Sequence, residues 1–178
     1  MEVMHSVTSY WHKRNTGEGK WTGSGDMDRA VFMRALMPAD KGEGKEMVRL
    51  EDGRYVIGFD DGYQLGKTAS HVFDNGIHRL GTTEPTLKEN SLFYDGEYFK
   101  IGEGRAAITE DKVSDDDARL RTMAAMAMEL RSEKVHNVKV VLAVGLPFSN
   151  YGRDKPKLID YYNRQDRLGF SYNFSESQ

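Results

Sequence analysis

The stretch YVIGFDDGYQLGKTAS, from Tyr55 to Ser70, carries the strongest structural signal in the chain. An apolar run leads into two aspartates and a glycine, and a second glycine followed by a lysine comes shortly after. Residues 54–60 predict a strand, because β-branched and aromatic residues are bounded by turn residues on both sides. The polar end of this strand predicts either a phosphate-binding turn or an ordinary hairpin tip.

The residues that follow predict further strands. Residues 67–76 indicate a second strand that ends in an Asp-Asn-Gly turn, and residues 77–81 indicate a third. Residues 91–94 and 97–101 flank an Asp-Gly pair, which is a strong signal for a tight hairpin. We therefore expect a three-stranded antiparallel meander followed by a hairpin insertion.

The hydrophobic period then changes from that of strands to that of helices. Residues 114–133 predict a helix whose acidic first turn suits the positive end of the helix dipole. Residues 138–144 are nearly all apolar, as in a strand buried on both faces. Residues 154–166, with Pro156 in the first turn, predict a second helix, and residues 168–174 a last strand. The fold class is α/β, with a meander that leads into helix-strand-helix-strand and a parallel portion.

Composition limits the class of protein. The 178 residues include 25 basic and 28 acidic side chains, which gives a net charge of −3, whereas a nucleic-acid binder would usually carry a basic surplus. No apolar run is long enough to span a bilayer, and the first residues lack the apolar centre of a signal peptide. The chain has no cysteine, which excludes disulfides and thiolate metal sites. We expect a cytoplasmic protein with no direct nucleic-acid or membrane contact.

The N-terminal part of the chain differs from the rest. Residues 1–47 are rich in Gly, Lys and Glu and poor in apolar side chains, so we expect a loosely structured extension before a folded domain over residues 48–178. Gly, Glu and Lys have purine-rich codons, so the run KGEGKE before Met47 is typical of a translated ribosome-binding site. We hypothesise that Met47 is the natural start. Mass spectrometry of the native N-terminus would detect Met1 if this hypothesis is wrong.

The two glycines and the lysine invite comparison with a Walker A phosphate loop. That loop needs four residues between its first glycine and Gly-Lys-Thr, and only three separate Gly62 from Gly66. Its lysine also opens a helix, whereas Lys67 is followed by a short β-like segment. The sequence therefore argues against a P-loop.

A phosphate site built on a hairpin fits the spacing better. Asp60 ends the strand, Gly62 lies in the turn and Lys67 lies near the start of the return strand. Main-chain N–H groups from Gly62 to Leu65 would form an anion nest. Asp60 would orient Mg²⁺ through water, and Lys67 would supply a point charge to the phosphates. An ordinary solvated turn remains the alternative interpretation of the same residues.

The motif DDGYQLGK resembles the first phosphate motif of the actin, Hsp70 and sugar-kinase superfamily. Together with the apolar strand that ends in Gly-Leu-Pro (VVLAVGLPFSNYGRDK), it resembles the N-terminal domain of bacterial actin-like proteins of the plasmid-segregation type. The resemblance spans roughly Tyr55 to Phe174 and implies an actin-like ATPase fold of the ribonuclease H-like kind. Carried over by position, Asp60 matches the aspartate near the metal, Lys67 matches the basic residue that faces the phosphates, and the phosphate loop corresponds to Asp61, Gly62, Tyr63, Gln64 and Leu65. Tyr63 departs from the family pattern, in which a small residue is common.

The resemblance also implies a function. The intact family member uses ATP or GTP with Mg²⁺, assembles into filaments, and works with a DNA-binding adaptor protein in plasmid or DNA segregation. In the family, the second phosphate loop and the water-positioning residue lie beyond the equivalent of Phe174, so the resemblance implies a truncated chain. Phosphoryl transfer needs groups on both sides of the phosphates. We therefore expect little or no ATPase activity from this chain, and a fragment without any cofactor is the alternative.

Two other functions stay open from the sequence. One is a non-enzymatic protein-binding module on the same fold, and the other is a fragment of a sugar-kinase-like phosphotransferase, against which the Gly-Leu-Pro loop argues. The five histidines show no metal-ligand spacing. The acidic triplet 115–117 is explained by the N-terminus of the predicted helix. No catalytic residue is predicted.

Overall fold

The computed structural model describes residues 47–105, 116–131, 133, 136–146, 151–164 and 168–174. Outside these ranges lie the predicted loose extension before residue 47, residues 114–115 of the first predicted helix and Pro147 of the Gly-Leu-Pro loop.

The described residues form a mixed α/β fold in which six strands precede the first described helix. In chain order they are β1 (Tyr55–Asp61), β2 (Leu65–Lys67), β3 (Val72–Asp74), β4 (Ile77–Gly81), β5 (Ser91–Tyr94), β6 (Glu97–Ile101), α2 (Asp116–Leu130), β7 (Val140–Val144), α3 (Tyr151–Asn163) and β8 (Ser171–Asn173). The predicted α/β class is confirmed, and so is the succession of strands, helix, strand, helix and strand.

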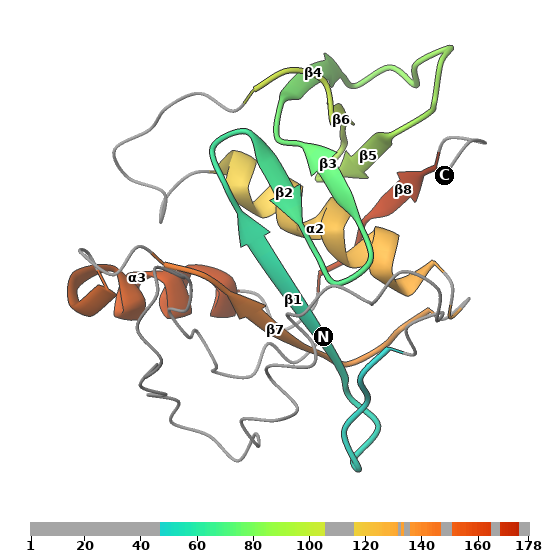
Figure 1. Ribbon diagram of the computed structural model, residues 1–178. Coiled ribbons are helices and arrows are strands. Elements are labelled where there is room, and N and C mark those ends of the chain that lie inside the picture. The colour runs from blue at the N-terminus through green and yellow to red at the C-terminus, as the bar shows by residue number, and fades with distance from the viewer. Residues whose placement is uncertain are drawn as a thin grey trace.

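β1 lies inside the first sheet, whose strand order is β3-β2-β1-β7 (Figure 1). β1, β2 and β3 form an antiparallel meander, and β7 lies parallel to β1 with Phe59 opposite Val144. All five residues of β7 are buried, as expected for a strand covered on both faces. A three-stranded antiparallel meander with a parallel strand beside it is therefore present, but its strands are not all the predicted ones. Because β1 and β7 are parallel, their carboxyl ends meet at one edge of the sheet.

The second sheet is antiparallel throughout, in the order β4-β6-β5-β8. β5 and β6 form the predicted hairpin. Asp95 and Gly96 at its tip have φ angles of 50° and 81°, and this left-handed pair is what a type I′ turn requires. β8 completes the sheet by pairing with β5, where Tyr172 lies opposite Leu92.

α2 joins the two sheets into one core. In Figure 1 it passes behind β2 and β3, and it contacts β1 and β2. Ten of its 15 residues are buried, which is more than a single apolar stripe would give. One cluster of buried side chains includes Ile57 and Phe59 from β1, Leu92 from β5, Met123 from α2 and Leu142 from β7. Both sheets therefore share the same hydrophobic core.

α3 packs beside α2 and begins earlier than predicted. Because the helix starts at Tyr151, Pro156 lies beyond its first turn, where it removes one backbone hydrogen bond. The hydroxyls of Tyr162 and Thr122 share a hydrogen bond of 2.8 Å, and Tyr161 donates to Asp116 over 3.2 Å. Neither α2 nor α3 has the length and apolar content of a membrane-crossing helix.

The predicted second strand is wrong in its extent. Residues 67–76 contain the end of β2, a turn and the whole of β3. The turn is made by Thr68, whose Oγ1 accepts from the His71 amide over 3.0 Å, while the Thr68 amide donates to the His71 carbonyl over 2.9 Å. A hydroxyl-based turn of this kind needs no Gly or Pro. The predicted third strand exists as β4, but it belongs to the second sheet rather than to the meander.

Candidate functional site

Asp60 and Lys67 lie opposite each other across the β1–β2 hairpin. They are direct register partners, and both are exposed. Directly opposed side chains lie on the same face of a sheet, so a carboxylate and an ammonium group share one exposed face. Asp60 comes one residue after the Phe59–Val144 pair, and Gly145 follows Val144. The two charges therefore lie at the edge where β1 and β7 end, beside the start of the Gly-Leu-Pro loop.

The hairpin tip consists of Tyr63 and Gln64, which are exposed, with Gly62 and Leu65 on either side. The Gly62 amide donates to the Leu65 carbonyl over 3.2 Å. A Cβ atom on Gly62 would lie 2.8 Å from that carbonyl oxygen, so the close approach of the two strands requires glycine there. Because the Gly62 N–H already donates within the hairpin, the predicted anion nest would depend on the amides that follow it.

The side chain of Asp61 points to the opposite face from that of Asp60, toward α2. Its two oxygens accept from Arg121 Nε over 2.8 Å and Nη2 over 2.9 Å. Arg121 is only 4% exposed, and a bidentate guanidinium–carboxylate pair of this type is strong and directional. The Asp61 carboxylate is therefore bound to α2. Within the predicted phosphate loop, Asp61 would act through its main chain.

Asn75, which directly follows β3, forms hydrogen bonds to the tip of the β1–β2 hairpin. Its Nδ2 donates to Asp61 Oδ1 over 2.9 Å and also to the Gly62 carbonyl, and its amide donates to the Gln64 carbonyl over 3.0 Å. Asn75 is fully buried. A Cβ atom on Gly66 would lie 2.6 Å from Asn75 Oδ1, so the second glycine of the motif makes room for this amide. These hydrogen bonds from Asn75 therefore hold the tip of the hairpin in place.

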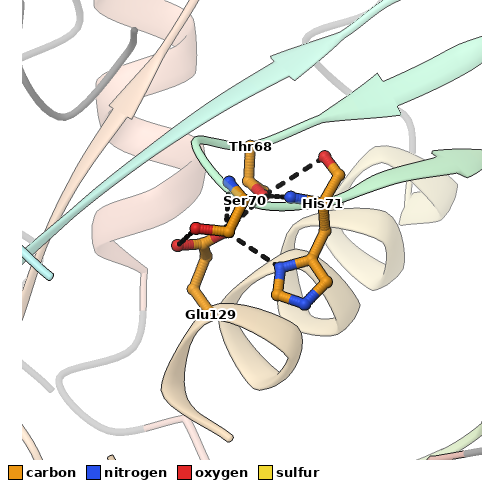
Figure 2. Close-up of polar contacts among 4 residues, drawn as sticks. All are labelled: Thr68, Ser70, His71 and Glu129. Carbon is orange, nitrogen blue, oxygen red and sulfur yellow. Dashed lines mark hydrogen bonds and ion pairs between the residues drawn. The ribbon is translucent and has the colours of Figure 1, made fainter. Parts of the chain in front are cut away.

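A second polar cluster lies at the other end of β2. Figure 2 shows Thr68, Ser70 and His71 in the β2–β3 turn, above the helix α2 from which Glu129 projects. Glu129 Oε1 accepts from Thr68 Oγ1 over 2.5 Å, from the Ser70 amide over 3.0 Å and from His71 Nδ1 over 3.0 Å. Glu129 is 8% exposed, so this carboxylate replaces its lost hydration with hydrogen bonds from the turn.

The charge of Glu129 depends on these donors. Burial by itself raises the pKa of Glu129, but hydrogen bonds from His71, Thr68 and the Ser70 amide outweigh burial and hold the pKa below its usual value. The hydroxyls of Thr68 and Ser70 both bond Glu129 rather than the His71 ring. A nucleophilic triad needs a hydroxyl on the histidine, so this geometry anchors the turn and does not form a nucleophilic site.

The predicted cofactor can be tested against the residues at the hairpin. Mg²⁺ commonly binds proteins through one or two carboxylates and keeps several waters, and the exposed carboxylate of Asp60 fits that mode. Lys67 on the same face fits a phosphate. Over the residues that the structure describes, no group of three or more His, Asp or Glu side chains could hold a metal ion directly. The exposed side chains of Asp60 and Lys67 therefore fit a water-mediated magnesium–phosphate site.

Sequence reasoning brought Asp60 and Lys67 together but missed Arg121, Asn75 and Glu129. Arg121 and Glu129 both stand among apolar residues of the predicted helix. A charged side chain on the buried face of a helix requires a partner of opposite charge or several hydrogen bonds. That signal could have flagged both residues, although it could not have named their partners. Asn75 was interpreted only as a turn residue.

Comparisons with known proteins add no family assignment. No protein-family model matches the chain, and no curated protein or solved structure matches it either.

Proposed function

We propose that this chain supplies the first phosphate-binding hairpin of an actin-like, ATP-binding, filament-forming protein that acts in plasmid or DNA segregation. The observation that carries the proposal is the Asp60–Lys67 pair, exposed on one face at the carboxyl ends of the parallel strands β1 and β7. Ligands of open α/β sheets bind at the carboxyl ends of the strands. The meander, the parallel β7 and the Gly-Leu-Pro segment after it are the features on which the actin-like resemblance rests.

Each residue of the hairpin has a distinct part in the proposal. Lys67 holds a phosphate oxygen as a point charge, and Asp60 orients the water shell of Mg²⁺. When bound, Mg²⁺ neutralises charge on the phosphate oxygens. Gly62 lets the two strands approach closely, and the main chain from Tyr63 to Leu65 faces the phosphates. In this proposal the hairpin forms one side of a nucleotide site.

The wider assignments belong to the same proposal. Self-assembly into filaments, a DNA-binding adaptor as partner and a cytoplasmic location follow from the actin-like interpretation. The competing function is a protein-binding module on the same fold that takes no nucleotide. Both share the fold, so nucleotide binding is the property that separates them.

Isothermal titration calorimetry of the full chain with Mg-ATP tests the proposal. We expect heat of binding that Lys67→Ala weakens about tenfold or more, because a hydrogen bond to a charged group contributes roughly 1.5–3 kcal/mol. Lys88→Ala is the matched control, since it removes the same charge from an exposed lysine that pairs only at the surface with Glu84.

Two results would contradict the proposal. One is the absence of heat at millimolar Mg-ATP, which would favour the protein-binding module. The other is an equal loss of affinity in both lysine variants, because that would reflect net charge and not a site at Lys67.

A further inference from the structure

Two side chains of α2 bind the meander, one near each end of β2. Near its N-terminal end Arg121 binds Asp61, and two turns later Glu129 binds the turn that contains Thr68 and His71. Eight residues of helix span about 12 Å. The first contact holds the tip of the proposed phosphate hairpin, whereas the second holds the turn that follows Lys67, so the two anchors can be compared within one molecule.

We propose that Arg121 is a positioning residue for phosphate binding, which acts on the hairpin through Asp61 and does not touch the ligand itself. This inference rests on the proposed function. Successive side chains of a strand point to opposite faces. When Arg121 fixes the Asp61 carboxylate against α2 in a bidentate pair, it also fixes the neighbouring Asp60 on the opposite, exposed face beside Lys67.

The Asp61–Arg121 ion pair also determines the net charge at the proposed phosphate site. Asp60 and Asp61 are adjacent carboxylates, and both would repel a polyphosphate. Arg121 neutralises Asp61 from the buried side and Lys67 balances Asp60 from the exposed side, so these four charges cancel. Without Arg121 the hairpin would carry a net negative charge at the point where the phosphates bind. A phosphate site can therefore contain two successive aspartates because α2 compensates one of them.

Three variants of the full chain test the inference. Arg121→Gln removes the buried charge. The double variant Asp61→Asn/Arg121→Gln removes both charges and leaves two amides that can bond each other. Glu129→Gln weakens the anchor at the other end of β2 and serves as the control for general loosening of the meander. Mg-ATP affinity is measured by calorimetry, and amide hydrogen exchange of residues 61–67 and 68–71 is measured without nucleotide.

We expect Arg121→Gln to lower Mg-ATP affinity about tenfold and to speed exchange over residues 61–67 by a similar factor, which corresponds to about 1.4 kcal/mol. The double variant should recover most of the affinity, because the charges at the hairpin again cancel. Glu129→Gln should speed exchange at residues 68–71 and change the affinity less than about twofold.

The outcomes separate this inference from the proposed function. Binding by the unchanged protein with equal affinity in Arg121→Gln overturns the positioning role and leaves the function standing. The role is also overturned if Glu129→Gln weakens binding as much as Arg121→Gln, because the loss would then follow stability alone. If the unchanged protein binds no Mg-ATP, the proposed function fails. In that case, unaltered hydrogen exchange at residues 61–67 in Arg121→Gln would show that Arg121 does not hold the hairpin in place.

Discussion

At the scale of single residues, two carboxylates tie the meander to α2 in different ways. Asp61 forms a bidentate pair with one guanidinium, whereas Glu129 accepts hydrogen bonds from a hydroxyl, a main-chain amide and an imidazole. Both exchange water for several hydrogen bonds, which is the condition for burying a carboxylate at low cost. The contact made by Glu129 depends on pH, because its donors are bound tightly only by the charged form of the carboxylate.

The lowered pKa of Glu129 predicts acid sensitivity. A carboxylate whose folded pKa lies below its unfolded value stabilises the fold above the unfolded pKa, and this stability is lost as pH falls through the folded pKa. Glu129→Gln should therefore lower the free energy of unfolding at pH 7 and make it fall less steeply below about pH 4.5. Urea unfolding at a series of pH values measures both effects.

Glu97→Gln is the control for this pH experiment. Glu97 pairs with Arg79 at the surface, where such pairs contribute about 0–1 kcal/mol. A Glu129→Gln variant whose stability keeps the same dependence on acid pH as the unchanged protein would contradict the prediction.

Part of the candidate site was predictable from residues alone. The sequence pattern placed Asp60 at the end of a strand and Lys67 near the start of the return strand, and the structure adds the register in which the two residues lie directly opposite each other. The ion pair between Asp61 and Arg121 joins residues 60 positions apart. Local pattern contains no information about such a pair, because it arises only when the helix packs on the sheet.

At the scale of elements, the sequence predicted which segments are strands better than it predicted how they pair. β1, the β5–β6 hairpin and β7 formed as expected because strong local signals defined them. β4 and β8 are strands as predicted, yet β4 pairs with β6 and not with the predicted meander, and β8, whose partner was not predicted, pairs with β5. Short strands of three to five residues have similar patterns wherever they pair, so tertiary packing decides their sheet.

β7 should be among the elements most sensitive to substitution. Leu142 is 4% exposed and lies opposite Ile57 in β1, so Leu142→Ala removes buried apolar atoms from the shared core and leaves a cavity. We expect a loss of about 2–5 kcal/mol in the free energy of unfolding, measured by urea denaturation.

Leu87→Ala is the matched control for this substitution. Leu87 is 78% exposed, so the same chemical change should alter the free energy of unfolding by less than about 0.5 kcal/mol. Similar losses in the two variants would show that Leu142 does not belong to the core as described.

At the scale of the whole molecule, α2 makes the two sheets interdependent. Phe59 and Leu142 from the first sheet and Leu92 and Phe99 from the second belong to one buried cluster with Met123. Val56 and Val141 form a second, smaller cluster in the first sheet, but the main core is shared by both sheets. The two sheets should therefore unfold together, as expected for a small single domain.

Differential scanning calorimetry can test this interdependence. We expect one transition over the described core, with calorimetric and van't Hoff enthalpies that agree. Leu92→Ala in the second sheet and Leu142→Ala in the first should shift that same transition to lower temperature, because both lose about 2–5 kcal/mol. Two resolved transitions, each shifted by only one of the substitutions, would contradict a common core.

The pairing of β8 with β5 has a consequence for how the chain reaches its native state. Asn173 Nδ2 donates to Ser91 Oγ over 3.0 Å, although the two residues are 82 positions apart in the chain. The β1–β7 pair likewise joins distant segments. Folding rates fall as contacting residues become more distant in sequence, because loop closure precedes any stabilising contact. The meander and the β5–β6 hairpin can form early, whereas the second sheet stays incomplete until β8 has been synthesised.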